Sequence, residues 1–226
     1  MTKRRSSAAD ATSEAGSTSS ADKPRPARPW TDEEMAAAKP LPLPTVDPTA
    51  PFGTGGAEMG VYDVNGDGLA DVVTAIAAHG WGLAWFEQKR DAQGNISFQR
   101  HDIMGDYTTK NAGGVTFSEP HGSTFADIDN DGVPDFIVGK RYWSHLDDYF
   151  DPDPYGDPVL YCYHTVRNPQ APGGAEFVPE LIHNRSGAGS DILAVDLNGD
   201  GLIDIITSTD RGTFIFWNLG NRGPGK

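Results

Sequence analysis

The sequence predicts an all-β fold built from three successive units of similar design. A nine-residue acidic phrase, Asp-x-Asn/Asp-x-Asp-Gly-x-x-Asp, occurs three times and begins at Asp63, Asp127 and Asp196. Short runs of β-branched and aromatic residues flank each phrase and are separated by turn residues, a pattern typical of strands. Four antiparallel strands per repeat are typical of a β-propeller blade. We therefore expect a partial β-propeller of three four-stranded blades, of which the last is incomplete.

Each unit is expected to follow the same strand order. One strand leads into the acidic phrase, a second leaves it, a third is aromatic and a fourth closes the unit. The third unit stops after its third strand. The expected strands are 59–62, 71–76, 83–86 and 96–100 in the first unit, 123–126, 135–138, 159–163 and 176–181 in the second, and 192–195, 204–207 and 213–217 in the third.

The composition divides the chain into two parts. Residues 1–57 are dominated by Ser, Ala, Thr, Pro and charged residues. With few large apolar side chains to bury, this part is expected to be a disordered, low-complexity tail. The repeats occupy residues 58–226, with blades at about 58–118, 119–186 and 187–218.

The acidic phrase predicts a cation site. Side-chain oxygens fall at positions 1, 3, 5 and 9, a glycine at position 6 permits a sharp turn, and the carbonyl of position 7 can add an oxygen. Calcium takes six to eight oxygen ligands. A metal-free turn rich in Asn-Gly and Asp-Gly is the alternative, but three copies in register favour about three Ca²⁺ sites. The expected ligands are Asp63, Asn65, Asp67, Leu69, Asp71, Asp127, Asp129, Asp131, Val133, Asp135, Asp196, Asn198, Asp200, Leu202 and Asp204, with the position-7 residues acting through their carbonyls.

An EF-hand is excluded by the flanks and by position 12 of the phrase. That position requires a bidentate Glu in an EF-hand, whereas here it holds Thr74, Val138 and Thr207. The flanking sequences are strand-like rather than helical. The phrase is therefore a different kind of cation loop.

The charge and the cysteine count exclude several classes of protein. The net charge of −14 argues against a nucleic-acid partner, which requires a basic surface. Ten carboxylates lie in the three acidic phrases, so the acidity is largely a property of the cation sites. The single Cys162 excludes an intramolecular disulfide and is expected to be a core thiol. No apolar run is long enough for a membrane span, and the basic start lacks the apolar stretch of a signal peptide.

With these loops, residues 58–218 resemble the FG-GAP/VCBS repeat proteins. The phrases Ala78–Glu87 and Gly139–Trp143 are also similar to bacterial members of that family. The resemblance implies calcium sites between the first and second strands of each blade. It also implies an extracellular or periplasmic location, although no signal peptide is expected in this chain.

Three blades are fewer than a closed ring requires, since propellers have four to eight. We expect either upstream blades outside this chain, or self-association that completes a ring, or an open array. Exposed blade edges would otherwise favour aggregation.

Candidate ligand-binding residues are expected on the face opposite the acidic loops. Loops that join strands 2 and 3, or one blade to the next, lie at that face and are rich in His, Arg and aromatic residues. Such side chains can stack on a sugar and hydrogen-bond to it. The alternative is that they only anchor long loops. The candidates are His79, Trp81, His121, Arg141, Tyr142, Trp143, His145, His183 and Arg185.

The sequence favours a binding module over an enzyme. The expected function is a calcium-binding scaffold for carbohydrate or another protein. The alternative is a sugar-active lyase or dehydratase, in which a histidine or a histidine-bound metal removes a proton beside a carbonyl. For that reaction the catalytic candidates are His79, His121, His145 and Arg141. His101 and His164 lie in expected strands and are expected to be structural.

Overall fold

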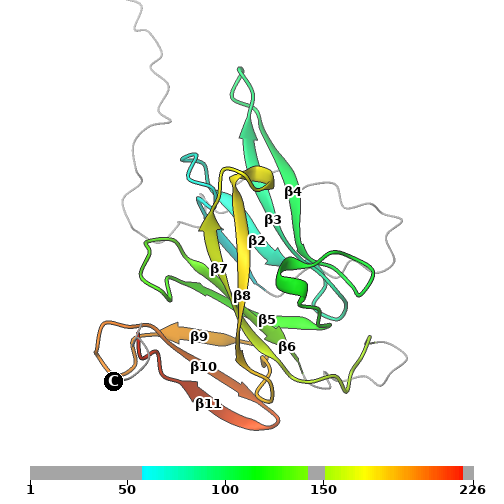
Figure 1. Ribbon diagram of the computed structural model, residues 1–226, viewed down its shortest axis with the longest axis vertical. Helices are drawn as coiled ribbons and strands as arrows, with labels where there is room; N and C mark the ends of the chain where they lie inside the picture. The colour runs from blue at the N-terminus through cyan, green and yellow to red at the C-terminus, as the bar shows by residue number, and fades with distance from the viewer. Residues whose placement is uncertain (1–57, 142–150, 221–226) are drawn as a thin grey trace, which may run out of the picture. The chain divides into compact units, whose positions relative to one another are not determined.

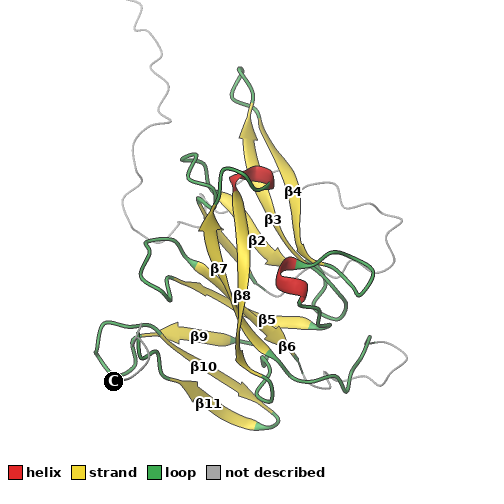
Figure 2. Cartoon of the chain, in the orientation of Figure 1, coloured by secondary structure: helices red, strands yellow, loops and turns green. Residues whose placement is uncertain are grey.

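The computed structural model describes residues 58–141 and 151–220. These residues form eleven β-strands and two 3-10 turns, so the fold is all-β, as Figure 2 shows. The strands are β1 (Met59–Tyr62), β2 (Asp71–Ala75), β3 (Leu83–Arg90), β4 (Ile96–Met104), β5 (Pro120–Ala126), β6 (Asp135–Lys140), β7 (Leu160–Arg167), β8 (Ala175–His183), β9 (Ile192–Val195), β10 (Asp204–Thr209) and β11 (Gly212–Phe216), and the turns are η2 (Ala112–Gly114) and η3 (Pro172–Gly174).

The strands make three antiparallel sheets in which chain neighbours are also spatial neighbours (Figure 1). The orders are β1-β2-β3-β4, β5-β6-β7-β8 and β9-β10-β11. The first strands of successive sheets lie beside one another, β1 against β5 and β5 against β9. The fold is therefore the predicted partial β-propeller, and we call the three sheets blades 1, 2 and 3. In the described part of the chain, blade 3 has three strands.

Several strands differ from their expected bounds. Strand β5 begins at Pro120, with a register irregularity between Pro120 and Ser123, so Pro120 and His121 belong to a strand rather than to a loop. His183, expected in a loop, is the last residue of β8. The β3–β4 hairpin is longer than expected, because β3 continues to Arg90 and β4 to Met104.

Two hydrophobic clusters join the blades. The larger one contains Trp85 of blade 1 together with Phe136 and Tyr163 of blade 2. The smaller one contains Ile137 of blade 2 and Ile205 of blade 3. Since successive side chains of a strand point to opposite faces, β6 contributes to both clusters, and all of its residues are buried.

Candidate functional site

The first acidic loop is closed by hydrogen bonds from its own backbone to its side chains. Asp63, at position 1, accepts the N–H of Gly66 at 2.7 Å on Oδ1 and that of Gly68 at 3.0 Å on Oδ2. Asn65 Oδ1 accepts the N–H of Asp67 at 3.0 Å, and Asp67 Oδ1 accepts that of Leu69 at 2.8 Å. The side chains of positions 1, 3 and 5 therefore turn back onto the backbone of the loop, although Asp67 stays exposed to solvent.

The same bonds recur in the other two loops. Asp127 and Asp196 accept the N–H of position 6, Gly132 and Gly201, at 2.9 Å in both cases. The glycine at position 6 has a φ of 85°, 90° or 87° in the three loops, a conformation that glycine adopts without the steric cost of a side chain. One local sequence thus produces the same loop three times.

The oxygens of the second loop lie close enough together to share a cation. In the second loop, one oxygen from each of Asp127, Asp129 and Asp131 lies within 4.8 Å of the other two. A carboxylate that accepts up to three backbone N–H bonds, as Asp63 does, still has a lone pair for a cation. A hard oxygen set of this kind fits Ca²⁺ better than a transition metal.

The aspartate at position 9 has a separate structural task. Asp71 is buried and accepts the N–H of Val64 at 3.0 Å on Oδ2 and that of Gln88, in β3, at 2.8 Å on Oδ1. Burial raises the pKa of the Asp71 carboxyl, although these two hydrogen bonds oppose the shift. The carboxylate therefore ties the loop and the third strand of the blade together.

This arrangement is repeated in blades 2 and 3. Asp135 accepts from Ile128 at 3.1 Å and from Thr165 at 3.0 Å. Asp204 accepts from Leu197 at 3.1 Å and from Asn218 at 2.9 Å. Position 9 thus joins each acidic loop to the third strand of its blade or to the residues just after that strand, a role that the sequence pattern alone did not reveal.

The loops also contact the neighbouring blade. Asn65 donates from Nδ2 to the carbonyl of Gly173 in blade 2 at 3.0 Å, and Arg167 donates from Nη2 to the carbonyl of Asp63 at 2.9 Å. In the same way, Asn218 of blade 3 donates to the carbonyl of Ile128 at 2.8 Å. The conformation of each of the first two loops is therefore coupled to the packing of two blades.

At the opposite end of the blades, the structure brings two of the predicted histidines together. His79, between β2 and β3, lies edge-on to His121 of β5, with ring centroids 5.3 Å apart. His79 Nδ1 is also 3.3 Å from Oδ1 of Asp151, a buried residue between β6 and β7. The two histidines come from different blades, so this end of the blade 1–blade 2 junction is a composite surface.

A buried ion pair lies next to these histidines. Lys140 Nζ is 3.2 Å from Glu119 Oε1 and donates to Ser118 Oγ at 2.6 Å, and all three residues are buried. Glu119 has a φ of 54° and a buried Oε2 without a hydrogen bond among the described residues. Burial raises the pKa of the Glu119 carboxyl, Lys140 opposes the shift, and Asp151 adds to it.

The remaining predicted residues of this face have varied surroundings. Arg141 donates its backbone N–H to the carbonyl of Glu119 at 3.0 Å. Trp81 packs edge-on against Tyr107 at 5.1 Å. His183 packs against Phe214 and Phe216 of β11, and the backbone N–H of Arg185 points to His183 Nδ1 at 3.4 Å. The predicted residues Tyr142, Trp143 and His145 lie outside the described residues.

The two strand histidines have structural partners. His101 stacks on Trp85 with centroids 4.4 Å apart and lies 2.9 Å from Glu87 Oε2. His164 lies between carboxylates of blade 2.

Sequence reasoning missed the burial of Ser118, Glu119 and Lys140, because their places at strand ends look like ordinary surface loops. The sequence from Ser118 to His121 could have indicated this burial, because a proline inside a strand-like run is typical of a strand end or an irregular pairing. Pro120 does begin β5, at the irregularity in its pairing with β6.

The comparison with protein-family models agrees with the repeat pattern. Residues 63–138 match the family model described as an FG-GAP-like repeat, a stretch that contains the first two acidic loops. No curated protein matches the chain. Among solved structures, an Agrocybe aegerita lectin, described as specifically recognising non-reducing terminal N-acetylglucosamine, is similar at 19% identity with a TM-score of 0.41. That match covers 72% of this chain and 35% of the lectin chain, so the protein spans about a third of the lectin's length.

No helix among residues 58–141 and 151–220 is long and apolar enough to cross a membrane.

Proposed function

We propose that the protein is a calcium-binding β-propeller repeat module that serves as a scaffold for binding carbohydrate or another protein. The observation that supports it most is the repetition of one hydrogen-bonded acidic loop in all three blades. Turns that only reverse the chain do not need four aligned carboxylate or amide groups. The match of residues 63–138 to an FG-GAP-like repeat supports the same function.

Calcium would be held by positions 1, 3, 5 and 9 and by the carbonyl of position 7. In the first loop these are Asp63, Asn65, Asp67, Leu69 and Asp71. Positions 1 and 5 supply full negative charges beside each other, and a divalent cation would relieve their repulsion. Three bound ions would offset six of the net −14 charges.

The calcium proposal is tested by Asp67→Asn, Asp131→Asn and Asp200→Asn. Asparagine keeps the Oδ1 that accepts the position-7 N–H but removes the charge. Each variant should lose about one calcium in a calorimetric titration while it stays folded. Asp91→Asn, which changes an exposed turn aspartate outside the loops, is the matched control. Unchanged calcium stoichiometry in all three variants would refute the proposal.

The ligand would bind at the end of the blades opposite the acidic loops. His79 and His121 are in contact there, the backbone of Arg141 bonds to the carbonyl of Glu119, and Trp81 adds an aromatic surface. A glycan array probed with the intact protein tests this location. Trp81→Ala and His79→Ala should lower binding at least tenfold, whereas Arg100→Ala, on the exposed side of β4, should not. Binding that is insensitive to all of these changes would place the site elsewhere.

One observation favours the enzymatic alternative, a sugar-active lyase or dehydratase. Glu119 combines a positive φ with a buried carboxylate oxygen that has no hydrogen bond among the described residues, and such strained, buried groups cluster at functional sites. In an elimination, His79 or His121 would remove the proton beside the carbonyl, and a hydroxyl group would leave as water.

Enzymatic activity is tested by incubating the protein with keto-sugars and following the ultraviolet absorbance of the unsaturated product. An activity lost in His121→Ala but kept in His101→Gln would support the enzyme. A glycan bound stoichiometrically and released unchanged would support the binding module.

A further inference from the structure

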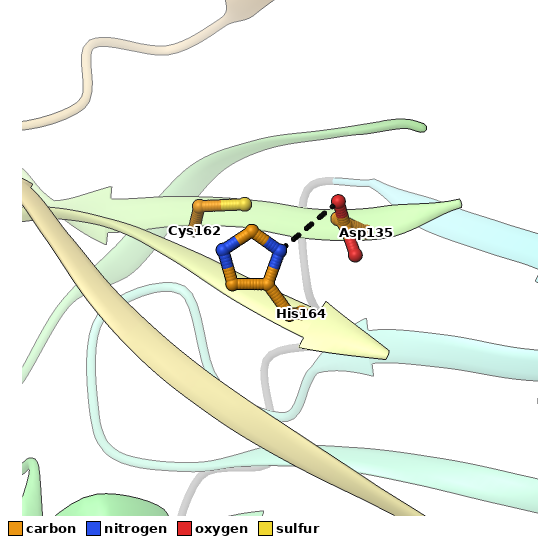
Figure 3. A group of neighbouring side chains, drawn as sticks. All are labelled: Asp135, Cys162 and His164. Atoms are coloured by element: carbon orange, nitrogen blue, oxygen red, sulfur yellow. Dashed lines mark ion pairs between the residues drawn. The ribbon is translucent and has the colours of Figure 1, made fainter. Parts of the chain in front are cut away.

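Blade 2 contains a group of metal-ligating side chains that blades 1 and 3 lack at the same positions. Asp135 begins β6, and the pairing of Phe136 with Tyr163 and of Ile137 with Cys162 aligns the two strands. Cys162 and His164 are two residues apart in β7 and so share one face of the sheet. Figure 3 shows the three side chains beside one another, and one ligand atom from each lies within 4.8 Å of the other two.

We propose that Asp135, Cys162 and His164 form a binding site for a thiophilic divalent cation such as Zn²⁺. The site would be chemically distinct from the calcium loops, since imidazole and thiolate favour zinc and other transition metals, whereas calcium takes oxygen ligands. The same register positions hold Trp85 and Glu87 in blade 1 and Ile215 and Trp217 in blade 3. Among the described blades, only blade 2 has this combination of sulfur and nitrogen ligands.

The orientation of His164 suits a metal ligand. Its Nε2 lies 2.9 Å from Glu180 Oε2, a contact that fixes the ring and leaves Nδ1 directed at the cluster. A ligating histidine commonly makes such a contact from its second nitrogen to a carboxylate. Nδ1 is buried and lies 3.3 Å from Asp135 Oδ2, as an ion pair rather than a well-formed hydrogen bond.

A fourth ligand is available beside these three. Asp129 Oδ2 lies 3.6 Å from His164 Nδ1, and its side chain is 41% exposed and so free to adjust. Zinc with tetrahedral N, O and S ligands has bonds of about 2.0–2.3 Å, so the cluster must contract by roughly 1 Å around the ion. Asp129 and Asp135 are also expected calcium ligands of the second acidic loop, so the two ions would lie next to each other and share these carboxylates.

A nitrogen or sulfur ligand must lose its proton before it binds a metal. Binding of the cation would therefore release the proton of the Cys162 thiol, and any proton on His164 Nδ1, to solvent as the metal–sulfur and metal–nitrogen bonds form.

The test is a Co²⁺ and Zn²⁺ titration of the full chain after chelation, with calcium present to fill the acidic loops. Cobalt bound to a thiolate gives a near-ultraviolet charge-transfer absorption, which is expected to saturate at one Co²⁺ per chain and to disappear when Zn²⁺ is added. Cys162→Ser should abolish this absorption, and His164→Gln should weaken zinc binding at least tenfold. Glu180→Gln should weaken zinc binding roughly tenfold, because the carboxylate that holds the His164 ring in place is lost.

His101→Gln is the matched control, because it removes a strand histidine paired with a carboxylate in blade 1. The control should bind zinc like the wild type.

Since Cys162 is buried, melting curves in calcium establish that each variant is folded, and His164→Gln still tests the site if Cys162→Ser fails to fold. Absence of thiolate absorption in the folded wild type, or zinc binding that is unaffected by His164→Gln, would overturn the proposal. Calcium stoichiometry measured in the same samples reports on the first and third acidic loops, which share no residue with this cluster, so the two proposals can fail independently.

Discussion

The position-9 aspartates show how a single side chain can hold a blade together. Each one is buried, and in blade 1 Asp71 accepts one N–H from its own loop and one from the third strand. In the unfolded chain, water solvates the carboxylate and both N–H groups. Removing the acceptor from the folded protein therefore leaves two donors in the interior without partners.

We expect Asp71→Ala to destabilise the protein by about 2–4 kcal/mol, because each buried donor without an acceptor costs about 1–3 kcal/mol. Urea unfolding in excess chelator measures this effect without any contribution from bound cations. Asp102→Ala, at a side chain that is 67% exposed and paired with Arg100, is the control and should change stability by less than about 0.5 kcal/mol. Similar losses in the two variants would contradict the proposed role.

Because of Glu119, we expect the free energy of unfolding to change with pH in the direction opposite to that caused by an ordinary salt-bridged carboxylate. Burial raises the pKa of its carboxyl in the folded state above the ordinary value of 4.5. As the pH falls from neutrality, the folded state takes up this proton before the unfolded state does. The unfolding free energy of the wild type should therefore rise relative to that of Glu119→Gln, with a slope of at most ~1.4 kcal/mol per pH unit down to about pH 4.5.

Urea unfolding of both proteins between pH 7 and pH 4.5 measures this difference. Glu176→Gln, at an exposed position in β8, should run parallel to the wild type over the same range. A wild type that loses stability relative to Glu119→Gln on acidification would show that Lys140 outweighs burial.

The strands themselves could be predicted with few errors because turn residues mark the boundaries within each repeat. The acidic phrase separates the first two strands, and alternating aromatic residues mark the third. The site clusters could not be predicted in the same way. The contact of Asp135 with His164 depends on strand register, and the burial of Glu119 depends on the irregularity between Pro120 and Ser123. Neither is visible until the neighbouring strands are placed.

The junction between blades 2 and 3 depends on close backbone approach. A Cβ at Gly122 in β5 would lie 2.7 Å from the carbonyl oxygen of Gly189, just before blade 3 begins. We expect Gly122→Ala to cost about 1–3 kcal/mol, since extra atoms in a packed site force the backbone to move. Faster hydrogen exchange in β9–β11 than in β1–β4 would locate the damage.

Gly94→Ala provides the comparison, because Gly94 has a φ of 81° but no atom lies within 4 Å of the point that a Cβ would occupy. Its cost should be limited to the backbone conformation, about 1 kcal/mol. Equal exchange rates in all blades of Gly122→Ala would argue against a localised effect.

At the scale of the whole molecule, net charge and calcium should dominate stability. The net charge of −14 produces self-repulsion that bound cations would reduce. Each site filled to a hundred times its dissociation constant would add ~2.7 kcal/mol. We expect a large rise in melting temperature when calcium replaces chelator, and equal melting curves in the two conditions would refute this prediction.

The first strands of blades 1 and 3 carry exposed apolar side chains in the single chain. Met59 and Val61 of β1 are 63% and 62% exposed, and Leu193 of β9 is 55% exposed. If copies of the chain pair through these strands, light scattering should give a mass that is a multiple of 24.2 kDa and that falls on dilution. A mass of one chain at every concentration would favour the monomer.

The hydrogen bonds of the position-9 aspartates also have a kinetic consequence. In blade 1 they join residues only 7 and 17 positions apart, and each strand pairs with its neighbour in the chain. Such local contacts shorten the search that a β fold requires before its first stable nucleus forms. Each blade can then assemble as a hairpin series before any cation arrives, as in other repeat proteins. Calcium would act mainly on the completed loops, so it should slow unfolding much more than it speeds refolding.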